Sequence, residues 1–238
     1  MNKQKYAPGL YHFLHTKSSL SFIILHSMEL VKKFLENELH LNPAEYLHKF
    51  ILYEKLLLEW NKKVNLISRK SVSIEDHILN SIFFLTKYKF DKISSIADIG
   101  TGGGFPGIPL KILFPEIEFE LIDSIQKKIV AVNDIIEKMN LKKIKAIYGR
   151  AEEISEESMY KKKFDIVISK AVAPLDELYI CGKTFLNNKG EMLCIKGGNI
   201  EVEINSLKKL KYKFQIKVIN FDFEELYKIE GKKLVIIN

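Results

Sequence analysis

The chain has 238 residues, 47% hydrophobic and 28% charged, a composition typical of a soluble globular protein with one α/β domain and a small addition. Its net charge of +7 favours an acidic partner such as RNA, DNA or a ribosome; the alternative is a lysine-rich composition with solvated faces. The longest apolar run near the start, residues 20–25, is too short to span a bilayer.

Residues 1–27 carry scattered Lys, His, Gly and Pro without a signal-peptide cleavage site. We expect a poorly ordered extension, with Met28 as a candidate natural start. Cys181 and Cys194 lack ligand-like spacing and lie in apolar surroundings, which predicts reduced core residues in a cytosolic protein.

Residues 28–92 predict an N-terminal helical cap. Asn42, Pro43 and Glu45 form a helix start, with Asn as the cap, Pro in the first turn and Glu reaching back. The residues that follow repeat apolar side chains every three or four positions, which indicates core packing; they are Tyr46, Phe50, Tyr53, Leu57, Trp60 and Val64. Another helix is predicted over residues 73–87.

From residue 93 onwards, apolar runs alternate with helical segments such as 125–140, and residues 93–238 read as one domain. The last two runs are joined by a short polar stretch and predict an antiparallel pair. The predicted strands are 93–100, 119–123, 144–148, 164–172, 191–197, 214–221 and 233–238. We therefore expect a Rossmann-like S-adenosylmethionine (SAM)-dependent methyltransferase fold, with a seven-stranded, mostly parallel sheet and one antiparallel strand.

The glycine-rich stretch at 97–110 joins a strand to a helix, whose free N–H groups and positive dipole end face any ligand over the turn. Gly102, Gly104 and Gly107 fit the G-x-G-x-x-G pattern of dinucleotide binding, and Asp123 lies where a ribose-binding acid belongs. The competing interpretation is SAM, with the turn starting at Gly100.

Charge favours SAM over a dinucleotide. Asp98 lies two residues before Gly100 and would repel a pyrophosphate, but would attract the ammonium and sulfonium of SAM. Pro106 and Pro109 also leave fewer N–H groups for a pyrophosphate. We expect Asp98, Gly100 and Gly102 to belong to the cofactor site.

Other candidates follow the neighbouring strands. Asp123 ends the second strand, where it can accept ribose hydroxyls or cap the next helix. Ala151 and Glu152 follow the third strand, where they either contact an adenine or belong to a surface turn. Lys170 ends the fourth strand, where it faces the cofactor, an RNA phosphate or solvent. Lysine clusters at 142–145, 161–163 and 208–213 are candidate phosphate contacts, although each alone is equally typical of a solvated face.

All six histidines precede the glycine-rich stretch, so an acid–base or nucleophilic site is hard to build in the α/β domain, and there is no Cys/His metal cluster. Methyl transfer to a ring nitrogen with a free lone pair needs positioning and no prior deprotonation. We therefore assign no catalytic residue and expect no metal. Hydride transfer with a nicotinamide cofactor and a non-catalytic RNA-binding module remain alternatives.

Together, several motifs resemble the rRNA small-subunit methyltransferase G family, also called glucose-inhibited division protein B, over about residues 28–238. They are 60–68, 76–82, 98–110, 121–124, 149–153, 168–175 and 196–198. The resemblance implies a cytoplasmic, SAM-dependent enzyme that methylates N7 of a guanine in 16S rRNA of the small ribosomal subunit. It places Gly100 and Phe105 in the SAM pocket, Asp123 near the ribose, and Ala151 and Glu152 near the adenine.

Two positions depart from the family pattern. Lys170 stands where the family usually has arginine, which keeps the charge and loses the planar fork. Asn80 stands in place of an aspartate, which removes a charge outside the cofactor pocket. We expect His77 to be structural and to pack the helical cap on the sheet.

Overall fold

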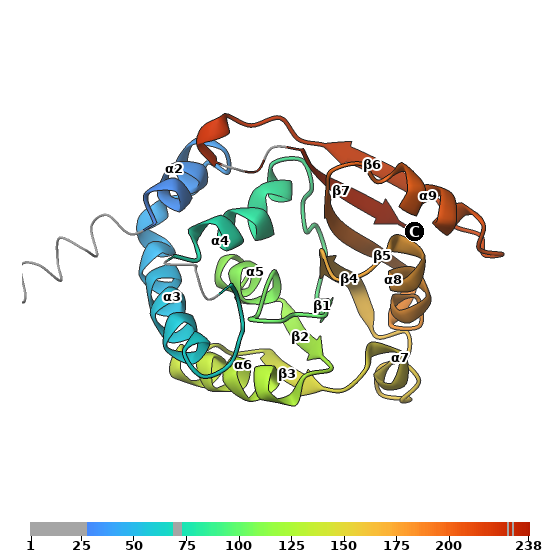
Figure 1. Ribbon diagram of the computed structural model, residues 1–238, viewed down its shortest axis with the longest axis horizontal. Coiled ribbons are helices and arrows are strands. Elements are labelled where there is room, and N and C mark those ends of the chain that lie inside the picture. The colour runs from blue at the N-terminus through green and yellow to red at the C-terminus, as the bar shows by residue number, and fades with distance from the viewer. Residues whose placement is uncertain (1–27, 69–72, 228, 230) are drawn as a thin grey trace, which may run out of the picture.

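The computed structural model describes residues 28–68, 73–227, 229 and 231–238; the extension expected at 1–27 lies outside them. Its centre is a seven-stranded sheet in the order β3-β2-β1-β4-β5-β7-β6 (Figure 1). The strands are β1 (Ser95–Ile99), β2 (Glu118–Asp123), β3 (Ile144–Tyr148), β4 (Phe164–Lys170), β5 (Leu186–Gly197), β6 (Ile216–Asn220) and β7 (Lys232–Ile237).

The direction of the strands follows the prediction from sequence. The pairs β1–β2, β2–β3, β1–β4 and β4–β5 are parallel, whereas β7 is antiparallel to both β5 and β6. Seven strands with one antiparallel member are thus confirmed. Because β1, β2 and β4 are parallel neighbours, their carboxyl ends meet at one edge of the sheet, the place where open α/β sheets bind ligands.

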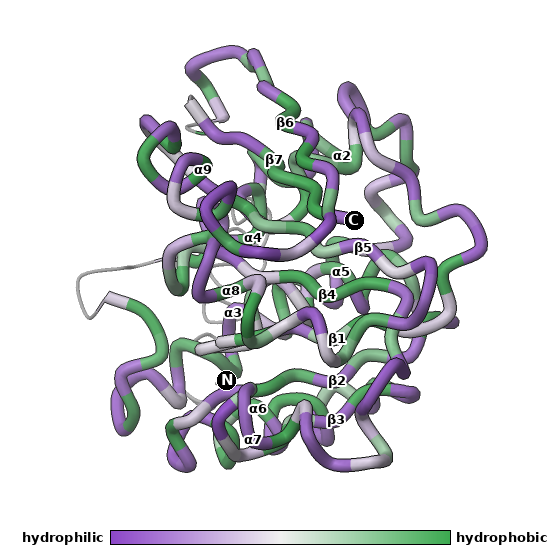
Figure 2. Tube along the Cα trace, turned by 90° about the vertical axis from the view of Figure 1, so that its right-hand side faces the viewer, coloured by the Kyte–Doolittle hydropathy of each residue, from purple (hydrophilic) through white to green (hydrophobic). Residues whose placement is uncertain are grey.

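Helices cover both faces of the sheet. Alternate residues of β1 enter different cores: Ile96 packs on one face and Ala97 on the other. In Figure 2 the central strands are mostly hydrophobic, as expected for strands buried on both faces. The first face is covered by α2 (Glu29–Asn37), α3 (Leu47–Asn61), α4 (Glu75–Ile82), α5 (Gly107–Leu113) and α6 (Gln126–Lys138), and the second by α7 (Ala151–Ile154), α8 (Leu175–Gly182) and α9 (Glu201–Lys208).

The helix starts differ in detail from the sequence pattern. Asn42 caps through its side chain, which accepts a hydrogen bond from the Ala44 N–H, but the turn that it starts is the 3₁₀ helix η1 (Pro43–Glu45). The α-helix itself begins only at Leu47. Likewise, the helix predicted over 73–87 is α4 followed by the 3₁₀ helix η2 (Phe83–Thr86), and a third such turn, η3 (Glu225–Tyr227), precedes β7.

Polar contacts fasten the N-terminal helices to the rest of the fold. The indole N–H of Trp60 in α3 donates to the Asp134 carboxylate in α6 at 2.6 Å. The Glu75 carboxylate accepts from the backbone N–H of Leu30 and of Val31, at the free N-terminus of α2. No helix in the described part of the chain is long and apolar enough to cross a membrane.

Candidate functional site

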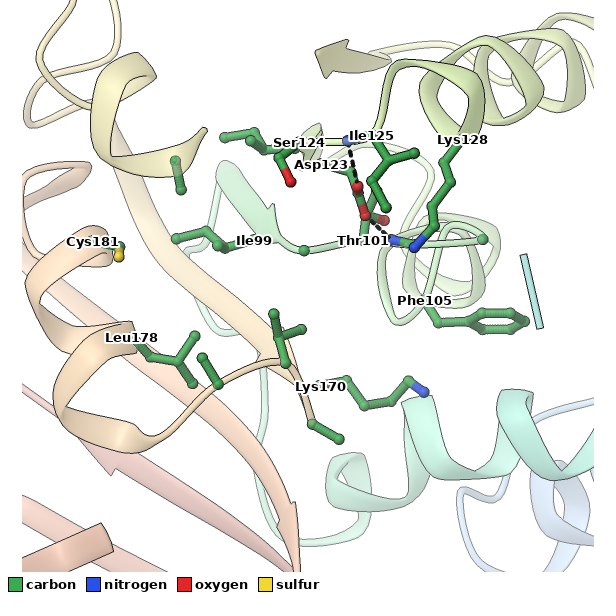
Figure 3. Close-up of a pocket in the computed structure, with 18 of the residues that line it drawn as sticks. Ile99, Thr101, Phe105, Asp123, Ser124, Ile125, Lys128, Lys170, Leu178 and Cys181 are labelled. Atoms are coloured by element: carbon green, nitrogen blue, oxygen red, sulfur yellow. Dashed lines mark hydrogen bonds between the residues drawn. The ribbon is translucent and has the colours of Figure 1, made fainter. Parts of the chain in front are cut away.

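A cavity of about 520 Å³ opens at the carboxyl ends of β1, β2 and β4 (Figure 3), a size typical of small-molecule sites. Seven of the eight predicted site residues line it: Gly100, Gly102, Phe105, Asp123, Ala151, Glu152 and Lys170. Their convergence was expected from the parallel strand ends. In Figure 3, Phe105 and Lys170 lie at one end of the cavity, and Leu178 and Cys181 lie at the other.

The glycine turn between β1 and α5 forms the floor of the cavity. Its first two N–H groups, of Gly100 and Thr101, donate to the Ile122 carbonyl of β2. Gly102 has φ of +58°, a conformation that L-residues avoid, and a Cβ there would meet no heavy atom within 4 Å. The backbone at Gly102 is therefore open to a ligand where any other residue would place a side chain.

Asp98 lies beneath this turn and is fully buried; it is the one predicted site residue that does not line the cavity. Its Oδ2 accepts from the Thr101 hydroxyl at 2.7 Å and from the Gly107 N–H at 3.0 Å. Oδ1 has no hydrogen-bond partner among the residues that the structure describes. Burial raises the pKa of Asp98 to about 7, although these two hydrogen bonds and the nearby Lys170 act in the opposite direction. The carboxylate thus braces the turn from inside.

Asp123, at the end of β2, combines the two roles that the sequence left open. Its Oδ1 accepts from the Ile125 N–H at 2.9 Å, at the start of α6, while Oδ2 accepts from the Gly102 N–H at 2.9 Å (Figure 3). A carboxylate has about four acceptor positions, so each oxygen retains capacity for a ligand hydroxyl. The same side chain therefore ties β2, the glycine turn and α6 together at the cavity wall.

Glu152 and Cys181 meet on the opposite wall. The Cys181 thiol donates to Oε1 of Glu152 at 3.2 Å. The pKa of Glu152 is lowered because its carboxylate accepts hydrogen bonds from the Glu152 backbone N–H and from the Cys181 thiol. Burial raises the pKa of the Cys181 thiol to about 12. This wall therefore presents an ionised carboxylate beside a neutral thiol, next to the buried Ala151.

Lys170, Phe105 and His77 form a cluster at the other end of the cavity. The Lys170 ammonium lies 5.3 Å from the centre of the Phe105 ring, and the His77 ring stacks on Phe105 with centroids 5.2 Å apart. Burial lowers the pKa of both Lys170 and His77, and the positive Lys170 lowers that of His77 further. His77 thus joins α4 of the helical cap to Phe105, in agreement with the packing role expected for it, and it also lines the cavity.

Two residues of α3 support the site from behind, which the apolar spacing alone did not reveal. The buried Tyr53 hydroxyl donates to the Gly103 carbonyl at 2.7 Å. The Asn61 carboxamide oxygen accepts from the N–H groups of Leu66 and Ile67 at 2.8 and 3.0 Å, and both of these residues line the cavity. Asn61 could have been recognised in the sequence as a candidate supporting residue, because it is polar and lies within an otherwise apolar helical pattern.

Further lining residues escaped the sequence analysis because their chemistry is generic. Thr101 and Lys128 border the cavity near Asp123, and Leu178 and Cys181 enter it from α8. No residue pattern marks a leucine or a lone cysteine as a ligand contact before the helices are placed. In the described part of the chain, no cluster of three or more His, Cys, Asp or Glu side chains is arranged to hold a metal ion.

Comparison with known proteins settles the family. Residues 46–228 match the GidB family, described as rRNA small subunit methyltransferase G. The chain belongs to this family. A curated Ribosomal RNA small subunit methyltransferase G from Mesoplasma florum is 42% identical over 191 residues, 79% of either chain. One from Clostridium botulinum (strain 657 / Type Ba4) is 37% identical over 194 residues, 81% of this chain and 79% of its own.

Solved structures confirm the methyltransferase fold of this family member. The mitomycin 7-O-methyltransferase MmcR aligns with a TM-score of 0.55 at 13% identity, over 69% of this chain and 54% of its own. Fibrillarin from Aeropyrum pernix, solved with natively bound S-adenosyl-L-methionine, aligns with a TM-score of 0.51 at 13% identity, over 73% and 86%. At this identity the likeness concerns the fold alone.

Proposed function

We propose that this chain transfers a methyl group from SAM to N7 of a guanine in 16S rRNA, within the small ribosomal subunit or its rRNA in the cytoplasm. The family description and the names of the curated relatives state methyl transfer to rRNA of the small subunit, and the proposal extends this to N7 of a guanine. The observation that supports the proposal most is the pairing of Asp123 with the open backbone of Gly102 at one cavity.

The residues present fit SAM. The cavity offers three different environments along its length. They are an ionised carboxylate with a thiol at one end, Asp123 in the middle, and an aromatic ring with a cation at the other end. SAM has a matching sequence of parts: adenine, ribose, and a methionine group with both charges. Gly102 leaves room for the part that lies against the turn, whereas the missing side chain of Gly100 makes room for Val172 on the cavity wall.

We assign the ribose hydroxyls to Asp123, whose two oxygens retain free acceptor positions. Glu152 and Ala151 would hold the adenine, with the Glu152 carboxylate accepting from its amino group and Cys181 keeping that carboxylate in place. Lys170 would meet the methionine carboxylate beside Phe105, an ion pair strengthened by burial of the lysine.

For Asp98 we propose an action through space. Because its carboxylate is buried and held by Thr101 and Gly107, it reaches a ligand by its field rather than by a hydrogen bond. In its ionised form, which burial limits by raising the pKa of Asp98 to about 7, this carboxylate favours a cationic methyl donor and opposes the pyrophosphate of a dinucleotide. A nicotinamide-dependent oxidoreductase is therefore the less suitable function for this site, because its cofactor carries such a pyrophosphate.

Catalysis would depend on positioning. Bound SAM supplies an electrophilic methyl group on its sulfonium. Guanine N7 has a free lone pair and carries no proton, so the site needs no general base, in agreement with the scarcity of histidine around the cavity. His77 and Phe105 would hold the base, with His77 kept neutral by burial and by Lys170.

The test uses purified protein, SAM labelled in its methyl group, and small ribosomal subunits from a strain that lacks this enzyme. We expect label in 16S rRNA, and mass mapping of RNA fragments should place it on one guanine. Calorimetry with SAM and with NADH separates the two cofactor classes. Label absent from RNA despite SAM binding would favour a non-catalytic RNA-binding module, and NADH binding without SAM binding would favour the oxidoreductase.

A further inference from the structure

The three lysine clusters of the sequence all lie away from the cavity. Residues 142–143 precede β3 and residues 161–163 precede β4, at the amino ends of parallel strands. Residues 208–213 connect the end of α9 to β6. None of these lysines lines the cavity, which opens at the opposite ends of the strands. They are therefore not contacts of the nucleotide that receives the methyl group.

In two of the clusters most lysines are paired with carboxylates; among the described residues only Lys142 and Lys162 of these clusters have no ion pair. Lys143 pairs with Glu116 at 2.8 Å, and Lys161 pairs with Glu156 at 2.7 Å. Lys145 and Lys163 both pair with the fully buried Glu120, and Lys163 also pairs with Glu118. These lysines balance local negative charge, so they leave little net potential to attract a polyanion.

The third cluster is different. Residues 204–221 contain five lysines and no Asp or Glu. These five side chains are exposed, and no ion pair is found for them within the described residues. We call this group the lysine patch; it consists of Lys208, Lys209, Lys211, Lys213 and Lys217. All five of its lysines lack an ion pair among the described residues, whereas four of the six lysines in the other two clusters are paired.

Aromatic contacts fix the patch on the body of the protein. The Lys183 ammonium, just after α8, lies 3.9 Å from the centre of the Tyr212 ring. Tyr179 of α8 packs against Tyr212 and against Phe214, with ring centroids 5.7 and 4.9 Å apart. The segment projects at the edge of the molecule next to α9 (Figure 1), so its lysines reach outward from a fixed base.

We propose that the lysine patch binds the phosphate backbone of the substrate RNA at a place separate from the nucleotide in the cavity. Three strand spacings, about 14 Å, separate β6 from β4 across the sheet. Because β6 runs parallel to β4, the part of the patch before β6 also lies toward the amino ends of the strands, away from Lys170 at the carboxyl end of β4. Lysines act as point charges on phosphates and carry no sequence information, so the patch would add affinity and orientation. This inference rests on the proposed function and extends it to a second contact.

RNA suits the patch better than a membrane surface does. A membrane-binding segment needs a continuous apolar face opposite its charges. Here the larger hydrophobic side chains of the segment, Leu207, Tyr212 and Phe214, pack against the protein itself. Although Tyr212 and Val218 are 47% and 36% exposed, the outward surface of the segment is mainly polar and carries five lysines, which release counterions when they meet closely spaced phosphates.

The test compares two double variants with the same loss of charge: Lys209→Gln with Lys211→Gln in the patch, and Lys143→Gln with Lys161→Gln among the paired lysines. Binding of transcribed 16S rRNA is measured at several salt concentrations. For the patch variant we expect the Kd to rise about tenfold, and the salt dependence (the slope of log K against log salt) to fall by about 1.5 to 2. The control variant should stay near wild type, and the Kd for SAM should be unchanged in both.

With unmethylated small subunits as substrate, the patch variant should raise KM and leave kcat unchanged. Equal RNA affinity and salt slope in the two variants would overturn the patch while leaving the proposed function intact. If the wild type methylates no RNA, the proposed function fails. If the patch variant also leaves the salt dependence of RNA binding unchanged, the lysine patch fails as an RNA contact as well. A patch that binds only acidic protein would show itself as unchanged RNA binding together with loss of binding to whole subunits, and would also contradict the proposal.

Discussion

Replacement of Asp98 by asparagine should change how the stability of the protein depends on pH. The side chain is fully buried, and burial raises its pKa to about 7 from 3.8. An asparagine has nearly the same shape and can still accept from the Thr101 hydroxyl and the Gly107 N–H. Asp98→Asn therefore removes the titration and keeps the two hydrogen bonds.

The sign and size follow from the two pKa values. Between pH 4 and pH 7 the unfolded chain has lost the proton of Asp98 while the folded chain retains it, so stability falls as pH rises. A difference of three pKa units corresponds to about 4 kcal/mol in the free energy of unfolding, since each unit is worth about 1.4 kcal/mol. More than half of this loss, roughly 2 to 3 kcal/mol, falls between pH 5 and pH 8.

Urea denaturation of the wild type and of Asp98→Asn at pH 5, 6, 7 and 8 measures the effect. The amide adds an unpartnered donor at the position of Oδ1, which shifts the stability of the variant by a constant amount and leaves the difference in pH dependence readable. We expect the wild type to lose roughly 2 to 3 kcal/mol more than the variant over this range. Parallel profiles would refute the reasoning, because Asp98 would then be ionised throughout.

Substitutions at three positions of the site, each with a matched control variant, give further tests. Gly102→Ala and Gly198→Ala both place a Cβ at positive φ in open space, so each should cost about 1 kcal/mol of stability, but only Gly102→Ala should weaken SAM binding in calorimetry. Asn61→Ala leaves two backbone N–H groups without their acceptor and should cost about 2–4 kcal/mol in urea denaturation, whereas Asn61→Asp keeps an acceptor and should cost less; equal losses would contradict this. Lys170→Ala should weaken SAM binding about tenfold to hundredfold while Lys170→Arg stays close to wild type, and a neutral Lys170→Ala would remove Lys170 from the cofactor site.

The strand pattern was predictable because it depends on local chemistry. Buried strands need continuous apolar runs, and all seven strands were recognised, the antiparallel β7 and the partly exposed β6 included. The largest error is at the start of β5, which begins at Leu186 rather than at 191. Its extra residues, Leu186 to Gly190, are partly exposed and polar, so no apolar run marks them. The motifs at strand ends predicted a shared cavity for the same reason, since parallel strands bring their ends together.

Other features depend on which groups meet in space. The sequence by itself determined the sheet, the glycine turn and the family resemblance, because short-range spacing fixes each of them. Only the tertiary structure decided that Asp98 lies beneath the turn and not in the cavity, and that His77 lines the site. It also decided that most lysines of two clusters are paired with carboxylates while those of the third are not. Burial and ion pairing join residues far apart in the chain, and a charge has its full effect only when its neighbours are known.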